Sequence, residues 1–180
     1  MLEDIQEVLI PSEVLKEKVK ELGRIISEDY KGKDLVVICV LKGGVVFYAD
    51  LIREITVPME MDFMAVSSYG ASTRSSGVVK IMKDLDTNIN DKHVLIVEDI
   101  IDTGLTLKHL KELLSTRGPL SVKICSALDK PSRRKVDIEI EYKGIEIPDK
   151  FVVGYGLDYS GKYRNLPDVC VLKPSVYSNS

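Results

Sequence analysis

The stretch VLIVEDIIDTGLT, residues 94–106, decides the fold of this chain. Four apolar residues run into two acids, Glu98 and Asp99; a third acid, Asp102, follows two more apolar residues. A continuous apolar run is typical of a strand buried on both faces of a sheet. The apolar spacing over 105–114 then predicts a helix. The stretch therefore predicts a strand, a turn and a helix, with carboxylates at the carboxyl end of the strand.

The same alternation of strands and helices continues along the chain. Helical periodicity is found over 14–26, behind Ser12 as the predicted N-cap, and a helix is predicted over 45–54. Apolar runs predict strands at 35–41, 59–66, 94–97, 122–128 and 151–153. This order predicts an α/β fold, with a parallel twisted sheet flanked by helices and joined by right-handed crossovers.

Composition and charge exclude several classes of protein. The chain has 180 residues, 44% of them hydrophobic, a net charge of −3 and a pI of about 5.5, which gives no general attraction to nucleic acid or to anionic membranes. One dense basic cluster, Lys130 to Lys135, is by itself typical of a solvated loop. No apolar run is long enough to span a membrane, and the acidic N-terminus is unlike a signal peptide.

The three cysteines lie inside apolar runs and fit no zinc spacing, so we expect buried free thiols and a cytoplasmic location. They are Cys39, Cys125 and Cys170.

Four stretches are predicted to meet where the strands end. In open α/β sheets, ligands bind beyond the carboxyl ends of the strands. The stretches that follow strands here are 42–44, 98–106, 129–130 and 154–158. The predicted site therefore combines glycines, acids and lysines from four separate parts of the chain.

The small residues Thr103, Gly104 and Thr106 stand where the predicted helix begins. Free N–H groups and the helix dipole at such a place favour a phosphate, while the alternative is plain N-capping by Asp102 or Thr103. Three acids beside a phosphate repel one another unless something lies between them. A ribose that donates its hydroxyls to Glu98 and Asp99 would meet this need, and Mg²⁺ would neutralise the remaining charge. The stretch thus indicates a ribose 5-phosphate site.

Residues 94–106 closely resemble the phosphoribosyl-pyrophosphate (PRPP) motif of the type I phosphoribosyltransferases. Further segments resemble the hypoxanthine (hypoxanthine-guanine) phosphoribosyltransferase branch: LKGG (41–44), SSYG (67–70), ALDKPSRR (127–134) and FVVGYGLDYSGKYRNLPDV (151–169). The resemblance spans essentially the whole chain. It implies one domain over 1–180, with a core of about 12–155, a small hood from about 1–11 and 156–180, and a mobile lid loop of about 67–78.

The resemblance implies a purine salvage enzyme that transfers the phosphoribosyl group of PRPP to hypoxanthine, and also to guanine, giving IMP or GMP and pyrophosphate. Its cofactor would be Mg²⁺, and the chain would form a homodimer or homotetramer in the cytoplasm. Asp102 would act as general base at purine N7. The implied ribose-phosphate set is Glu98, Asp99, Asp102, Thr103, Gly104, Leu105 and Thr106, and the implied metal ligands are Glu98, Asp99 and Asp158.

For pyrophosphate, the resemblance implies Lys42, Gly43 and Arg164, with a cis peptide bond between Lys42 and Gly43. The purine set is Lys130, Phe151, Val152 and Asp158. A lysine can donate to the 6-oxo group of hypoxanthine or guanine but cannot accept from the 6-amino group of adenine. Taken singly, Lys130 is typical of a solvated edge, Phe151 of a core strand, Arg164 of a surface position and Gly43 of a strand-to-helix turn.

Ser68 and Tyr69 match lid residues of the family. A lid has a physical reason here, because water would capture the oxocarbenium-like centre that forms as pyrophosphate leaves. Two other functions are disfavoured. A nucleic-acid-binding regulator on the same fold is disfavoured by the acidic pI, and a phosphoacceptor receiver domain carries its acid pair after the first strand, whereas here the acids follow the third.

Overall fold

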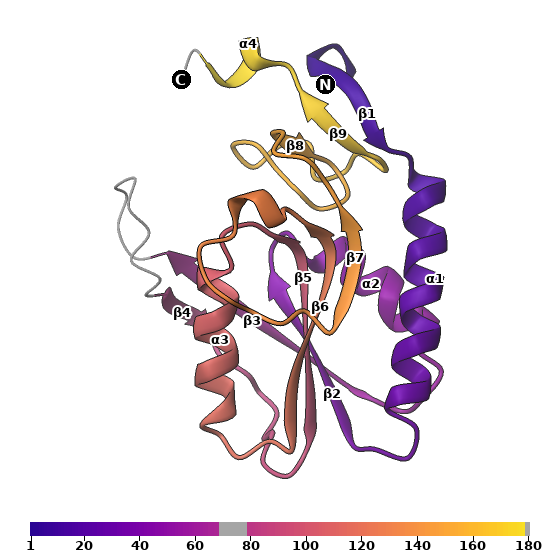
Figure 1. The fold of residues 1–180 in the computed structure, drawn as a ribbon, viewed down its shortest axis with the longest axis vertical. Helices are drawn as coiled ribbons and strands as arrows, with labels where there is room; N and C mark the ends of the chain where they lie inside the picture. The colour runs from indigo at the N-terminus through magenta and orange to yellow at the C-terminus, as the bar shows by residue number, and fades with distance from the viewer. Residues whose placement is uncertain (69–78, 179–180) are drawn as a thin grey trace.

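The computed structural model describes residues 1–68 and 79–178. Its main sheet has the order β4–β3–β2–β5–β6–β7 and is parallel except for β4, which pairs with β3 in the antiparallel direction (Figure 1). The strands are β2 (Leu35–Leu41), β3 (Glu60–Ser68), β4 (Val79–Lys83), β5 (His93–Ile101), β6 (Ser121–Asp129) and β7 (Tyr142–Glu146). The predicted α/β fold with a parallel sheet is confirmed. The sequence did not predict β4 and β7, which form the two edges.

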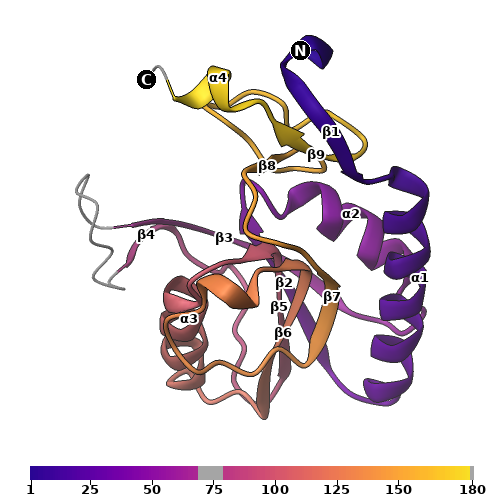
Figure 2. The ribbon, with the colours of Figure 1, turned by 45° about the horizontal axis from the view of Figure 1, so that its top comes forward.

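Helices cover both faces of this sheet. α1 (Ser12–Asp29) and α2 (Val45–Glu54) lie on one face, and α3 (Leu105–Ser115) lies on the other (Figures 1 and 2). The buried faces of the helices form two cores: Leu22 and Leu51 lie in the first, and Leu110 lies in the second. Each fully buried side chain of this kind contributes about 1.5–3 kcal/mol to the free energy of unfolding.

The prediction that Ser12 caps α1 is wrong. The N-cap of this helix is Pro11, and no side chain of the described residues caps it. The backbone N–H of Ser12 instead donates to Asp168 Oδ1 at 2.6 Å, and Asp168 lies 156 residues further along the chain. The first turn of α1 is therefore fixed by a tertiary contact.

A second sheet, of three strands, lies above the carboxyl ends of the main strands (Figure 1). Its order is β1 (Ile5–Ile10), β9 (Val169–Leu172) and β8 (Val152–Val153), all antiparallel. A 3₁₀ turn (Leu2–Asp4) precedes it, the short helix α4 (Pro174–Tyr177) follows it, and another 3₁₀ turn (Pro131–Arg133) follows β6. Residues 151–153 were expected to complete the parallel strand set. This is wrong, because Val152 and Val153 pair with β9 in the small sheet.

The direction of the strand order reverses between β2 and β5. β2 pairs with β3 on one side and with β5 on the other, so the chain crosses over in opposite directions from these two strands. Such a switch point leaves a crevice at the carboxyl edge of the sheet. β5 is also longer than the predicted 94–97, because residues as far as Ile101 continue to pair with β6. Two of the three acids therefore lie in the strand itself.

None of the described helices is both long and apolar enough to cross a membrane. The three cysteines are free and buried, as predicted.

Candidate active site

The amino terminus of α3 opens into a cavity of about 220 Å³. It is lined by Glu98, Ile100, Ile101, Asp102, Thr103, Gly104, Thr106 and Leu107. Gly104 is the N-cap of α3 with a φ of 80°, a left-handed conformation that favours glycine, and no side chain of the described residues caps the helix. The nearest contact of that kind joins Thr103 Oγ1 to the N–H of Leu105 at 3.4 Å. Plain capping therefore does not explain these residues.

Glu98 and Asp99 form a half-buried pair of adjacent carboxylates. Burial and the neighbouring Asp99 raise the pKa of Glu98 well above its usual range. Burial also raises the pKa of Asp99, although a hydrogen bond from the N–H of Ile100, at 2.7 Å, and the charge of Arg164 oppose this shift. An acid pair with raised pKa values favours a ligand that brings hydroxyl donors or positive charge.

The turn after β2 packs directly against Asp99. A Cβ atom built at Gly43 would stand 1.7 Å from Asp99 Oδ2, so any larger residue would displace this carboxylate. The cis peptide bond of this turn joins Leu41 and Lys42. The predicted position, between Lys42 and Gly43, is therefore wrong by one bond. A single sequence does not show which peptide bond is cis.

Arg164 holds the loop that packs against this turn. Its Nη1 donates to the carbonyl oxygen of Gly156 at 2.6 Å, and its Nη2 lies 2.7 Å from Asp158 Oδ1. Gly156 has a φ of 98°, and a Cβ there would stand 2.1 Å from the carbonyl oxygen of Gly43. Two of the three predicted pyrophosphate residues, Gly43 and Arg164, thus lie near Asp99. The side chain of Lys42 is exposed.

A second cavity, of about 410 Å³, lies beneath the small sheet. It is lined by Ile100, Asp102, Lys130, Arg133, Asp149, Lys150, Phe151, Val152, Leu157 and Asp158. All four residues predicted to bind purine line this cavity. Phe151 is 40% exposed, so it is not the core residue that a lone strand phenylalanine suggests.

Lys130 is buried, with only 8% of its surface exposed. Its Nζ donates to the carbonyl oxygen of Lys150 at 2.7 Å and lies 4.0 Å from Asp149 Oδ1. Burial lowers the pKa of Lys130, while the charges of Asp102 and Asp149 act in the opposite direction. The reading of this position as a solvated edge is wrong.

Asp102 lines both cavities, as does Ile100. Its Oδ1 accepts a hydrogen bond from Arg133 Nε at 2.8 Å, and Arg133 Nη1 lies 3.6 Å from Asp149 Oδ2. Among the described residues, Asp102 is thus the one carboxylate that lines both the cavity at the amino terminus of α3 and the second cavity.

Sequence reasoning missed two kinds of residue in this site. Arg133 and Arg134 belong to the basic cluster that was interpreted as a solvated loop, yet Arg134 Nε donates to the carbonyl oxygen of Asp102 at 3.1 Å and its guanidinium pairs with the buried Asp129. Ile100 was counted only as an apolar residue between acids. The sequence feature that could have identified Ile100 as a site residue is its position inside the motif, directly after the acid pair.

The predicted lid lies largely outside the described residues. Tyr69 is not described, and Ser68 is described only as the last residue of β3. Among residues 1–68 and 79–178, no group of three or more His, Cys, Asp or Glu side chains could hold a metal ion. Asp158 is engaged by Arg164 and by the N–H of Gly161, which donates to Asp158 Oδ2 at 2.7 Å.

Known proteins share this architecture over the full chain. Residues 11–160 match the phosphoribosyl transferase domain family. A hypoxanthine-guanine phosphoribosyltransferase of Bacillus subtilis is 55% identical over 99% of each chain, and one of Staphylococcus aureus is 52% identical over 99% of this chain and 100% of that protein. A crystal structure of a hypoxanthine phosphoribosyltransferase from Staphylococcus aureus superposes with a TM-score of 0.97, at 52% identity, over 99% of this chain and 97% of that one. The chain therefore belongs to the phosphoribosyltransferase family, in the hypoxanthine-guanine branch that its motifs resemble.

Proposed function

We propose that this protein transfers the 5-phosphoribosyl group of PRPP to hypoxanthine and to guanine, forming IMP or GMP and releasing pyrophosphate. One observation carries the proposal: Asp102 and Ile100 form a common wall of two cavities. The cavity at the amino terminus of α3 suits a phosphate, and the one lined by Lys130 and Phe151 suits a base. A ribose that joins the two would hold its C1′ atom near this wall.

The ribose phosphate is assigned to the first cavity. Its phosphate would accept hydrogen bonds from the first N–H groups of α3, in the turn of Thr103, Gly104, Leu105 and Thr106. The ribose hydroxyls would donate to Glu98 and Asp99. Support comes from the raised pKa values of this acid pair, which has no positively charged partner as close as a salt bridge among the described residues.

Pyrophosphate is assigned to the turn of Lys42 and Gly43 together with Arg164. This assignment is supported by the chain of contacts from Asp99 through Gly43 and Gly156 to Arg164. The two cations and the N–H groups of the turn would stabilise the negative charge that builds up as pyrophosphate leaves C1′.

The purine is assigned to the second cavity, with its ring against Phe151 and its polar edge against the backbone of Val152. Lys130 Nζ would donate to the 6-oxo group, and its present bond to the carbonyl oxygen of Lys150 uses one of its three protons. Adenine presents a donor at this position, so the site would reject it. Sites that bind a polar group in this way discriminate by about 10⁴–10⁵.

Asp102 is assigned as the general base. As N9 of the purine forms its bond to C1′, the proton on N7 would pass to Asp102, and the C1′–oxygen bond to pyrophosphate would break. Arg133 holds the carboxylate at 2.8 Å in the free protein. This contact keeps Asp102 oriented at the junction of the cavities.

Mg²⁺ fits the acids of this site, since it needs only one or two carboxylates when substrate phosphates supply the remaining oxygens. Glu98, Asp99 and Asp158 are the residues that would hold it, directly or through water. When bound, it would neutralise charge on the pyrophosphate.

We further propose that the enzyme works in the cytoplasm as a homodimer or homotetramer and binds no nucleic acid. Buried free thiols support the location. Light scattering coupled to size-exclusion chromatography measures the oligomeric state.

A transfer assay tests the proposed function. PRPP, Mg²⁺ and one base at a time are supplied: hypoxanthine, guanine, xanthine or adenine, with nucleotide formation followed by absorbance. We expect rapid turnover of hypoxanthine and guanine and none of adenine. If every 6-oxopurine is inert while PRPP or a nucleotide still binds, the site is a sensor, and salt-dependent RNA binding becomes the next measurement.

A further inference from the structure

An aromatic cluster supports the proposed purine-stacking ring from the side away from the cavity. The ring of Phe151 is stacked on that of Tyr177, with centroids 4.9 Å apart and planes at 25°. Tyr159 meets Phe151 edge-on, with centroids 5.7 Å apart and planes at 87°. Tyr159 also meets Tyr177 edge-on, at 6.5 Å. Each of the three rings therefore touches the other two.

The placement of Phe151 makes this support necessary. The backbone of Phe151 is fixed, because its carbonyl oxygen accepts a hydrogen bond from the N–H of Leu172 at 3.1 Å. Its side chain, however, is 40% exposed, so the core of the protein does not hold it in one orientation. A base that stacks on a loose ring must first order that ring, and ordering it weakens binding.

The two tyrosines stand outside the cavity. Phe151 lines it, whereas neither Tyr159 nor Tyr177 does. Since a ring has two faces, one face of Phe151 is covered by Tyr177 and the other is left for a ligand. Stacked and edge-on contacts at these distances are the arrangements that aromatic rings prefer.

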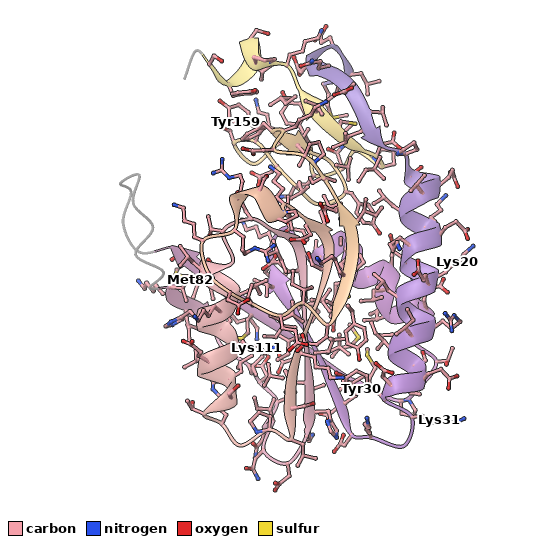
Figure 3. The ribbon with its side chains drawn as sticks, viewed as in Figure 1. Lys20, Tyr30, Lys31, Met82, Lys111 and Tyr159 are labelled. Carbon is pink, nitrogen blue, oxygen red and sulfur yellow. The ribbon has the colours of Figure 1, made fainter. Side chains whose placement is uncertain are left out.

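The cluster is anchored at the end of the molecule that holds the small sheet and α4 (Figure 1). Figure 3 shows Tyr159 there, close to the carboxyl-terminal segment and far from Tyr30 at the opposite end. Tyr177 ends α4, and it packs against a small core that includes Val153 and Leu172. Just before α4, the N–H of Lys173 donates to the carbonyl oxygen of Asp4 at 2.9 Å. This contact ties the segment carrying Tyr177 to the amino-terminal segment.

We propose that Tyr177 is a positioning residue for purine binding: it stacks on the outer face of Phe151 and holds the ring so that the inner face receives the base. The inference rests on the purine site proposed above. It makes the short helix α4 part of that site, although α4 contributes no residue to the cavity wall.

Four variants of the full chain test this role, each measured for the KM of hypoxanthine and the KM of PRPP. Tyr177→Ala is expected to raise the KM of hypoxanthine by about 3- to 10-fold, the factor to which one aromatic contact corresponds, and to leave the KM of PRPP unchanged. Tyr177→Leu keeps apolar packing against the small core but has no ring, and should behave in the same way. Tyr177→Phe retains the stack and should restore the wild-type KM. Ser175→Ala, an exposed position on the same helix, is the control.

An unchanged or lowered KM of hypoxanthine in both Tyr177→Ala and Tyr177→Leu would overturn the proposal, as would an equal rise in the KM of PRPP. Phe151→Ala separates this failure from failure of the purine site. If Phe151→Ala raises the KM of hypoxanthine and the Tyr177 variants do not, only the role of Tyr177 is wrong. If Phe151→Ala leaves it unchanged, the purine assignment is wrong and the positioning role is overturned with it.

Discussion

Replacing Asp102 with asparagine separates its proposed catalytic role from its structural one. The amide has the shape of the carboxylate and keeps an oxygen that can accept the hydrogen bond from Arg133 Nε, now at 2.8 Å from Asp102 Oδ1. It cannot take a proton from purine N7. The substitution therefore removes the base and leaves the local packing in place.

The expected magnitudes follow from the exposure of the ion pair and from the chemistry. The side chains of Asp102 and Arg133 are 41% and 47% exposed, and an exposed pair of this kind contributes about 0–1 kcal/mol to the free energy of unfolding. For a chain of this length, that corresponds to a fall in Tm of at most about 2–4 °C. Loss of a general base lowers kcat by about 10²–10⁴. The substitution should therefore lower kcat strongly while Tm hardly changes.

The assay is the formation of IMP at saturating PRPP and hypoxanthine, together with a thermal unfolding curve. Asp149→Asn is the matched control, because Asp149 lines the same purine cavity and its Oδ2 lies 3.6 Å from Arg133 Nη1. This control should keep kcat close to that of the wild type. Asp102→Asn with near wild-type kcat would refute the general-base role. An equal fall in both variants would show that the cavity needs negative charge and that proton acceptance is not the reason.

Two further predictions concern the pyrophosphate turn and the stability of the fold. Gly43→Ala should raise the KM of PRPP at least tenfold, because the new methyl group would overlap the carboxylate of Asp99; Gly32→Ala, where nothing lies within 4 Å, should leave the kinetics unchanged despite its positive φ. Burial alone would raise the pKa of Asp62, but the N–H groups of Thr87 and other residues donate to it and lower its pKa. Its stabilising effect is thus present above about pH 4 and is lost as the pH falls through the lowered pKa, so urea unfolding of Asp62→Asn should show a deficit of about 2 kcal/mol at neutral pH that disappears in acid. A deficit that did not change with pH would contradict this assignment.

The parts of the fold that were predictable are those whose pattern is local. The run Leu35–Leu41 is buried on both faces in β2, and the spacing after Thr103 became α3 with nearly the predicted bounds. The two edge strands were not predicted from the sequence, because β7 contains a glycine and charged residues and because β4 pairs with only one neighbour. Their assignment depends on the partner strand, which a local pattern does not contain.

The same distinction applies to the site. Contiguous motifs contain the acids, the glycine turn and the lysine, so the resemblance to the family identified these residues. Arg133 contacts Asp102, 31 residues away, and Tyr177 stacks on Phe151, 26 residues away. Nothing near either residue marks these contacts, and a cluster of arginines by itself is typical of a solvated loop.

The strand of the central motif does not keep one alternation of faces along its whole length. Leu95 packs in the core beneath α1 and α2, and Ile96 packs in the core beneath α3, as the alternation of a strand requires. Continued alternation would assign Ile100 to the second core and Ile101 to the first, but the structure shows the reverse. The change of face falls between Ile96 and Ile100, the segment that holds the acid pair. Beyond this segment, Ile100 and Asp102 line both cavities, so the irregular end of the strand coincides with the wall at which the proposed reaction would join a base to a ribose.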